Sequence, residues 1–321
     1  MQTIEHGGSV YHIQDNGDAV LAEFTGQVRT LVLPRQIDGH PLTGVDHDAF
    51  EHAEPIAAFA TEDGHPAFTV LDGVLFSADG KTLIRYPAGA AADRYQVPKG
   101  VTKLAAGAFL KAERLTAIYV PEGVREIEHH AFDGCGALTD ISLPGTVSAL
   151  GHCVFRGCGK LKNIDIPENH PLIELDGAFL IDLKEHAVVC CLPALCRAEM
   201  TVPEDIHYVD EYAFYGCLQL EKVQFHRGLR TLGRYAFYHC RNLKSVELHE
   251  GLRSIGTRAF SGCEELKTLF VPDSVTSIEY KAFNNCPRLY LSVNKGSYAA
   301  RYCRQFGFPC KHRIQWPWQK S

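Results

Sequence analysis

The sequence has no excess of basic residues and no long apolar run. Its 321 residues include 32 Lys and Arg against 38 Asp and Glu, which gives a formal net charge of -6 and a pI near 6.2. A nucleic-acid-binding protein needs a basic face to neutralise phosphates, so this composition argues against a nucleic-acid partner. The longest apolar stretches, such as residues 187–192, fall far short of the roughly 20 residues of a membrane span. We therefore expect no nucleic-acid partner and no membrane-spanning segment.

The first residues, MQTIEHGG, also lack the basic and apolar regions of a secretory signal peptide. This start predicts a protein that stays in the cytoplasm. The cysteine content is 12 in 321 residues, which is below the density of a small disulfide-stapled domain. The spacing of the cysteines is therefore more informative than their number.

An internal repeat dominates the sequence. A phenylalanine, usually preceded by alanine, recurs with steps of 59, 23, 23, 59, 23, 23 and 23 residues. These repeat phenylalanines are Phe50, Phe109, Phe132, Phe155, Phe214, Phe237, Phe260 and Phe283. The order of the steps indicates a block of 105 residues, one long coil and two short ones, that is used twice and followed by one further short coil. A fixed period of this length is typical of a solenoid, in which stacked coils share one core.

Each coil combines a short strand with a turn. In the coil that contains Phe237, Val223 and Phe225 alternate as an inward-facing strand, and Gly233 leads into Ala236 and Phe237. We expect a single helical or 3₁₀ turn around this Ala-Phe pair. The two 59-residue steps carry 36 extra residues each, and the first has apolar runs on both sides of an Asp-Gly turn, which predicts a β-hairpin. Hairpin insertions are thus expected near 64–98 and 169–203, projecting from the solenoid or packed along its edge.

The two ends depart from the repeat, as caps should. Residues 1–30 are predicted to form a strand cap and residues 31–288 the solenoid. Residues 289–311 form a closing segment in which Tyr298, Tyr302 and Phe306 have helical spacing. Residues 312–321 are a tail that is either disordered or folded back on the cap.

The coil pattern resembles the BspA-like leucine-rich repeats of bacterial surface and gut-associated proteins. The frame Cys-x-x-Leu-x-x-Ile-x-Ile-Pro-x-x-Val-x-x-Ile-Gly-x-x-Ala-Phe-x-x-Cys matches residues 140–144, 270–283 and, as a first coil, 31–45. The resemblance covers about residues 28 to 310. It implies a solenoid of leucine-rich repeats that binds proteins, often as an adhesin, from a secreted or cell-surface position. A secreted or cell-surface location is therefore the alternative to the cytoplasmic location expected from the first residues.

Six cysteines lie three residues after a repeat phenylalanine: Cys135, Cys158, Cys217, Cys240, Cys263 and Cys286. One cysteine per coil makes a row, whereas zinc needs ligands that converge, so we interpret them as a column of small buried side chains. Adjacent Cys190 and Cys191 should point to opposite faces of a strand. Cys303 and Cys310 could pair in an oxidising compartment. No metal and no cofactor are expected.

The histidines raise the question of a metal or catalytic site. His226 and His249 are 23 residues apart and so in register on neighbouring coils, but the repeat supplies no third ligand. Solvated surface histidines are the simpler interpretation. The sequence has no Gly-x-Ser-x-Gly, His-Glu-x-x-His or phosphate-loop motif. We therefore expect a protein that is not an enzyme.

A binding surface is predicted on the strands. The middle residue of each Ile-x-Ile strand should point outward on the concave face, with a parallel row two positions earlier that begins at Ala117. The candidate binding residues are Tyr119, Asp140, Ser142, Asp165, Gln224, Glu247 and Phe270. We expect a non-catalytic module that binds a protein partner there. The alternatives are a glycan-binding solenoid, a metal- or redox-active protein that uses the histidines and irregular cysteines, and a purely structural role.

Overall fold

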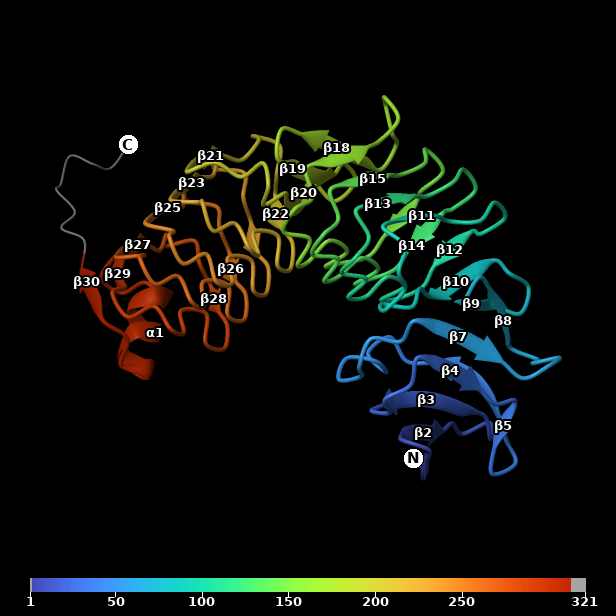
Figure 1. Cartoon of the computed structure of the whole chain (residues 1–321). Coiled ribbons are helices and arrows are strands. Elements are labelled where there is room, and N and C mark those ends of the chain that lie inside the picture. The colour runs from blue at the N-terminus through green and yellow to red at the C-terminus, as the bar shows by residue number, and fades with distance from the viewer. Residues whose placement is uncertain (1, 313–321) are drawn as a thin grey trace. The chain divides into compact units, whose positions relative to one another are not determined.

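A computed structural model describes residues 2–312 of the chain. The chain divides into two compact units, Met1–Pro171 and Leu172–Ser321, called here the first and the second unit. Each is built mainly from short β-strands that succeed one another coil by coil (Figure 1). The predicted β-solenoid with a spacing of about 23 residues is confirmed.

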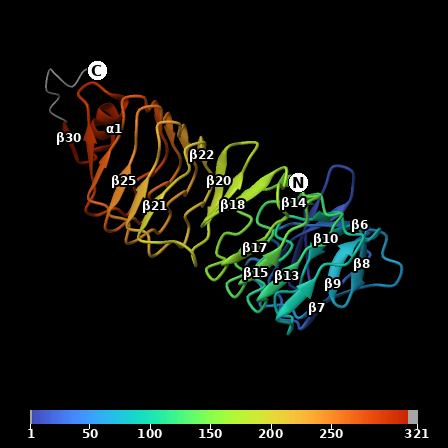
Figure 2. The ribbon, with the colours of Figure 1, turned by 90° about the horizontal axis from the view of Figure 1, so that it is seen from above.

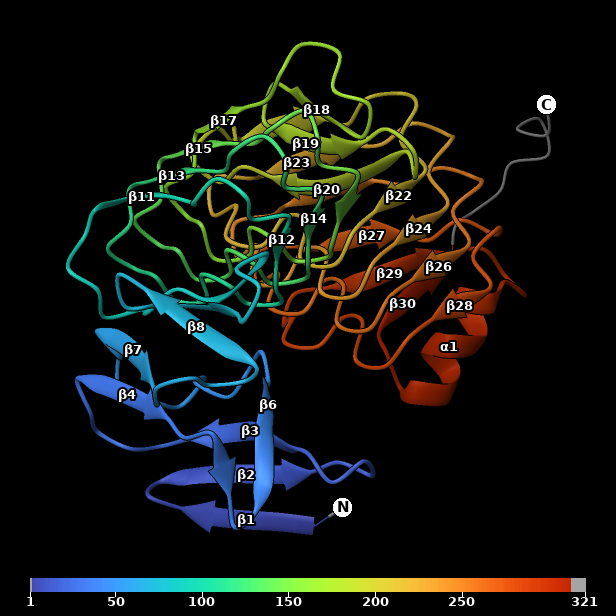
Figure 3. The same ribbon diagram turned by 90° about the vertical axis from the view of Figure 1, so that its right-hand side faces the viewer.

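The first unit begins with a five-stranded sheet. In it β1 (Gln2–His6), β2 (Ser9–Ile13) and β3 (Ala19–Phe24) are antiparallel, β6 (His40–Val45) pairs parallel with β3, and β5 (Gln36–Ile37) is the edge strand (Figure 3). The strand cap was predicted for residues 1–30, whereas β5 and β6 extend this sheet to Val45. The strand β1 is almost entirely exposed, so no inward-facing pattern marks it.

Each coil contributes a two-residue strand to a parallel sheet, and the insertions form the start of that sheet. In the first unit the order is β8 (Phe68–Leu71), β9 (Val74–Ser77), β10 (Thr82–Arg85), β12 (Lys103–Leu104), β14 (Glu126–Ile127) and β16 (Ala149–Leu150). In the second unit it is β18 (Ile173–Asp176), β19 (Phe179–Asp182), β20 (Ala187–Cys191), β22 (Tyr208–Val209), β24 (Thr231–Leu232), β26 (Ser254–Ile255) and β28 (Ser277–Ile278). The first three strands of each sheet are antiparallel, and the rest are parallel.

The insertions are therefore three-stranded meanders that continue the sheet. A buried histidine holds the start of each one. The Nε2 atom of His65 lies 2.9 Å from the carbonyl oxygen of Pro34, and that of His170 lies 3.2 Å from the carbonyl oxygen of Pro144. The repeated His-Pro pair thus fastens the chain to a neighbouring coil just before it leaves the regular repeat.

A second set of strands, three residues long in most coils, forms the other side of the stack. The first unit has β4 (Thr30–Leu33) beside β7 (Ala58–Thr61), and β11 (Arg94–Gln96), β13 (Ala117–Tyr119), β15 (Asp140–Ser142) and β17 (Asn163–Asp165) in one parallel sheet. The second unit has β21 (Glu199–Thr201), β23 (Lys222–Gln224) and β25 (Ser245–Glu247) in one sheet, and β27 (Thr268–Phe270), β29 (Tyr290–Val293) and β30 (Cys310–His312) in another. We call these the long strands.

The repeat phenylalanines of neighbouring coils stack on one another in the core. The ring centroids of Phe214 and Phe237 are 4.6 Å apart, and those of Phe237 and Phe260 are 5.2 Å apart with nearly parallel planes. All three side chains are fully buried. A coil alone could not cover such a ring, so each coil depends on its neighbours for its core.

The helical or 3₁₀ turn expected around each Ala-Phe pair is not formed, and α1 is the only helix in residues 2–312. The backbone there bonds to the next coil instead: the amide of Phe237 donates to the carbonyl of Ala259 at 2.7 Å. The residue before the Ala-Phe pair has a left-handed conformation in most coils, with φ of 55° at Tyr235 and 52° at Arg258. A left-handed residue interrupts a right-handed helix at a cost of roughly 1–2 kcal/mol. The inter-coil hydrogen bonds offset this cost.

The C-terminal cap contains the expected helix, α1 (Tyr298–Phe306), beside the last long strands (Figure 2). The side chain of Ser297 accepts a hydrogen bond from the amide of Ala300 at its start, and left-handed Gly307 ends it. Ala299, Ala300 and Cys303 are buried against the solenoid core. The predicted tail lies outside the described residues, except for its first residue, His312, which ends β30.

Candidate functional site

The outward side of the long strands in the first unit carries four of the predicted binding residues on three neighbouring strands. Parallel pairing places Gln96, Tyr119, Ser142 and Asp165 in one register row. Asp140 belongs to the parallel row, two positions earlier. The residues between the two rows point inward, as Ile118 and Ile141 show by their burial. The first-unit strand face is defined here by the four residues of the register row together with Asp140 and Asn163.

Tyr119 is the large aromatic side chain of this face. Its side chain is 44% exposed, although it lies on the inner strand β13 between polar neighbours. The parallel row is less open than expected, because Ala117 is buried to 6% exposure. Its register neighbours on the two adjacent strands are Arg94 and Asp140. Ala117 therefore contributes little to the exposed surface of the parallel row.

Asp140 is held in its ionised form by its neighbours. The Thr139 hydroxyl donates to it at 2.6 Å and the Asn163 amide donates to it at 3.2 Å. These hydrogen bonds lower the pKa of the Asp140 carboxyl group below its ordinary value. The first-unit strand face therefore presents a fixed negative charge close to the exposed ring of Tyr119.

The remaining three predicted residues lie on two sheets of the second unit. Gln224 and Glu247 are in register on β23 and β25, and Phe270 is on β27. The amide of Gln224 donates to Glu247 at 2.8 Å, and Thr201 donates to Gln224 at 3.4 Å. The polar groups of this row satisfy one another, and Phe270 is only half-exposed. Within the second unit, β23 and β25 belong to one sheet and β27 to another.

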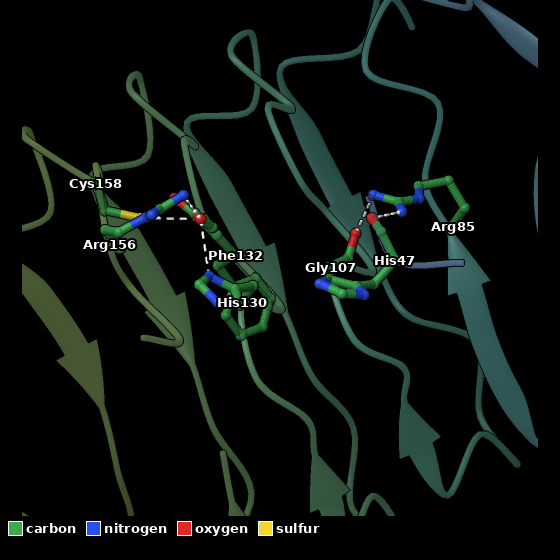
Figure 4. A network of polar contacts seen from close by, with 8 residues as sticks. His47, Arg85, Gly107, His130, Phe132, Arg156 and Cys158 are labelled. Carbon is green, nitrogen blue, oxygen red and sulfur yellow. Dashed lines mark hydrogen bonds and ion pairs between the residues drawn. The ribbon is translucent and has the colours of Figure 1, made fainter. Parts of the chain in front are cut away.

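A polar network connects the turns of the first unit (Figure 4). The guanidinium group of buried Arg85 donates to the backbone carbonyl oxygens of His47 and Gly107. Further along the stack, buried Asp133 accepts from His130 at 2.9 Å and from Arg156 at 2.5 Å. Burial lowers the pKa of Arg85 to about 10. The contacts of Arg85, and that of Arg156 with Asp133, join different coils and help to hold the stack together.

A pocket of about 390 Å³ lies beside Arg85. Its wall combines the aromatic residues Phe50, Phe59 and Tyr86 with the basic residues Lys111 and Arg114. The guanidinium carbon of Arg85 is 5.3 Å from the ring centroid of Phe50, which is cation–π distance. No sequence pattern indicates this pocket, because its residues come from the first coil, the first insertion and the next coil.

The six repeat cysteines are buried, as the sequence predicted. Most of them also make a contact that the sequence did not indicate. The thiols of Cys240 and Cys263 donate to the carbonyl oxygens of Phe214 and Phe237, at 3.1 and 3.3 Å. The same contact to the preceding repeat phenylalanine is made by Cys135, Cys158 and Cys286. We call this row, together with Cys217, the cysteine ladder.

Cys217 is the exception in the ladder, because it meets two cysteines of the second insertion. Its thiol faces the carbonyl oxygen of Cys191 at 3.7 Å, and the sulfur atoms of Cys191, Cys196 and Cys217 all lie within 4.8 Å of one another. All three residues are buried. Cys191 and Cys196 do not lie at the repeat position three residues after a phenylalanine, so the repeat pattern did not assign them a role. The signal that could have found them is the 105-residue offset, which aligns them with Tyr86 and Ala91.

The histidines singled out by the sequence do not converge on a metal. Both ring nitrogens of His226 are occupied: Nε2 lies 2.7 Å from the carbonyl oxygen of Ile206, and Nδ1 accepts from the amide of Gly228. His249 lies 3.8 Å from Glu247. Within residues 2–312, the three cysteines above are the only group of three or more potential metal-ligating side chains at this spacing. The shared metal considered for His226 and His249 has no support in this geometry.

Cys303 and Cys310 are both free thiols in the C-terminal cap. Burial and a hydrogen bond with Cys310 raise the pKa of Cys303 to about 12. The two side chains are therefore neighbours, and their pairing under oxidising conditions stays a prediction.

Comparison with known proteins agrees with the repeat. The family model described as BspA type leucine rich repeat region matches six copies over residues 90–180 and 195–297, which is more than half of the chain. A search of curated proteins finds no match. A leucine rich cell surface protein from Faecalibacterium prausnitzii is similar in structure, with 17% identity, a TM-score of 0.67, and coverage of 98% of this chain and 96% of that protein. The pneumococcal vaccine antigen PcpA has 17% identity, a TM-score of 0.60, and coverage of 92% and 82%.

The cytoplasmic location expected from the first residues gains no support from these comparisons, since the Faecalibacterium protein is described as a cell surface protein. The helix α1 has nine residues. Residues 2–312 contain no helix with the length and apolarity needed to cross a membrane.

Proposed function

Because this chain belongs to the BspA-type leucine-rich-repeat family, we propose that it is a non-catalytic module that binds a protein partner on the first-unit strand face. The observation that carries the proposal is the position of Tyr119. An aromatic ring that is 44% exposed on an inner strand leaves apolar area in water that a partner can cover. Tyrosine is among the residues most often found as binding hot spots in protein interfaces.

The surroundings of Tyr119 suit a protein partner. Ser142 lies beside it in register, and the carboxylates of Asp140 and Asp165 lie on the next two strands. This combination of one aromatic anchor with a polar rim is the usual composition of a protein-binding patch. The fixed charge of Asp140 favours a partner that presents a basic group next to its apolar contact.

The face of the second unit is the weaker candidate. Thr201, Gln224 and Glu247 form a chain of side-chain hydrogen bonds along the row. A partner would have to compete with these bonds, and the row has no exposed aromatic side chain. Gln224, Glu247 and Phe270 therefore stay as secondary binding residues in this proposal.

The test places a photo-crosslinking phenylalanine derivative at position 119 of the full chain. The matched control carries the same residue at Tyr280, which is 66% exposed but lies in a turn of the second unit. Both proteins are illuminated in extracts of the cell surface and of the cytoplasm of the source bacterium. We expect one protein to crosslink from position 119 and not from position 280. The extract that yields it identifies the compartment.

The competing glycan function is tested with the same positions. Wild type, Tyr119→Ala and Tyr280→Ala are compared on a carbohydrate array. Sugar binding that requires Tyr119, without any protein crosslinked from position 119, would replace the protein partner with a glycan. Equal crosslinking from both positions would refute the assignment of the binding site to this face.

A further inference from the structure

The three converging cysteines come from separate parts of the second unit. Cys191 ends β20, Cys196 lies in the turn that follows, and Cys217 is the ladder position of the next coil. Their sulfur atoms lie within 4.8 Å of one another, and each side chain is buried. Thiols buried singly are common packing residues, but three sulfur atoms within 4.8 Å of one another require a more specific explanation.

The repeat itself does not demand this cluster. The equivalent positions in the first block, 105 residues earlier, are Tyr86, Ala91 and Ala112. The backbone confirms the equivalence, because the amide of Tyr86 donates to Ala108 at 2.7 Å and the amide of Cys191 donates to Ala213 at 2.6 Å.

In the first block the ring of Tyr86 stacks on the repeat phenylalanine Phe109, with centroids 5.4 Å apart. The fold therefore accepts an aromatic ring and two alanines where the second unit has three thiols. Packing alone does not account for three cysteines at one place.

We propose that Cys191, Cys196 and Cys217 form a binding site for one soft, thiophilic metal ion of the Cu(I) type, held by three sulfur ligands. Soft thiolate ligands select soft ions. With metal–sulfur bonds of about 2.3 Å, a trigonal arrangement separates the sulfur atoms by about 4 Å, which lies within the observed limit. Only small side-chain movements are needed to close the site.

The number of ligands decides between ions. Structural zinc is almost always bound by four ligands, and within residues 2–312 no fourth Cys, His, Asp or Glu side chain joins the group. Hard ions such as Mg²⁺ or Ca²⁺ require oxygen ligands, which the cluster does not offer. A three-coordinate soft ion is thus the species that fits the ligand set.

Binding has a defined proton balance and a structural consequence. Each thiol that coordinates as a thiolate releases its proton to the solvent, so the affinity for Cu(I) rises with pH. The bound ion ties the turn after β20 to the following coil, at the point where the insertion returns to the regular repeat. We therefore expect the ion to stabilise the second unit.

The experiment uses the full chain, purified without oxygen and with all thiols reduced. Cu(I) is titrated in competition with a chromogenic Cu(I) chelator, and bound copper is counted per chain. The test variant is Cys196→Ser, which removes the cysteine outside the ladder. The matched control is Cys240→Ser, which removes an equally buried ladder thiol that is not in the cluster. Circular dichroism of the metal-free proteins confirms that each variant is folded.

We expect one tightly bound copper ion per chain in wild type and in Cys240→Ser, and none in Cys196→Ser. Copper should raise the melting temperature of the first two proteins only. If Cys196→Ser is unfolded, Cys196→Ala replaces it, because alanine occupies the equivalent position 91. Equal copper binding by the test and control variants, no copper retained by wild type against the chelator, or preferential binding of Zn²⁺ would each overturn the proposal.

Discussion

The thiol of Cys240 donates a hydrogen bond to the carbonyl oxygen of Phe214, which precedes it by 26 residues and lies 3.1 Å away. The same carbonyl oxygen also accepts from the amide of Cys217, at 3.2 Å. One carbonyl group thus closes the turn of its own coil and anchors the cysteine of the next. The cysteine ladder combines buried volume with a hydrogen bond between coils, and this dual role is more specific than the packing role expected from the sequence.

This relationship predicts that Cys240→Ala is destabilising. The substitution removes one buried hydrogen bond and leaves a small cavity, and together these should cost about 1–2 kcal/mol. Urea denaturation followed by circular dichroism measures the loss. Cys310→Ala is the control, because Cys310 is only partly buried and its removal should cost less stability. Equal losses in the two variants would show that the ladder hydrogen bond contributes nothing.

The core and the outward face should respond differently to truncation. Phe237 is fully buried between the rings of Phe214 and Phe260, so Phe237→Ala should cost about 3–5 kcal/mol. Tyr119→Ala removes an exposed ring and should change the free energy of unfolding by roughly 0.5 kcal/mol or less. The measurement is again chemical denaturation, with fluorescence and circular dichroism compared as probes. Similar losses for both substitutions would contradict the assignment of inside and outside.

The regular part of the fold could be predicted because its signal is repeated. The 23-residue step between Phe214, Phe237 and Phe260 predicted the stack and its buried aromatic column. The prediction of a helical turn around each Ala-Phe pair was wrong. The sequence does not reveal that the amide of Phe237 donates a hydrogen bond to the next coil. Propensity describes bonds within one segment, whereas these turns are stabilised by bonds between coils.

The site could be predicted less well than the fold. The outward direction of Tyr119 follows from strand alternation, but the split of β25 and β27 into separate sheets has no counterpart in the repeat pattern. The convergence of Cys196 with Cys217 depends on a turn whose path has no periodic signal. A repeat pattern describes neither feature.

Thiol reactivity offers a test of burial across the whole chain. Desolvation raises the pKa of two ladder cysteines, to about 11 for Cys286 and further for Cys240. The thiolate is the reactive form, so these cysteines should resist iodoacetamide at pH 8. Cys190 and Cys310, which are partly exposed, should be alkylated first, as peptide mass spectrometry would show. Rapid alkylation of Cys240 or Cys263 in the folded protein would contradict the buried ladder.

Titration of the Asp140 carboxyl group at acidic pH tests the polar contacts of the first-unit strand face. Hydrogen bonds from Thr139 and Asn163 lower the pKa of Asp140 in the folded state, so the folded form binds fewer protons at this site than the unfolded form. The resulting stabilisation is present above the unfolded value of 3.8 and is lost as the pH falls through the folded value. Carbon-detected NMR titration of the Asp140 carboxyl group should therefore show a midpoint below 3.8.

The variant Asn163→Ala removes one of the two hydrogen bonds and should move this midpoint upward, toward 3.8. Lys162→Ala is the matched control, because Lys162 is adjacent in the sequence and lowers the pKa only through its charge, a smaller cause than either hydrogen bond. Its effect should shrink in high salt, which screens exposed charges, while that of Asn163→Ala should persist. A midpoint that does not move in Asn163→Ala would mean that the ladder of polar side chains across β15 and β17 is not maintained in solution, and the fixed charge beside Tyr119 would lose its structural basis.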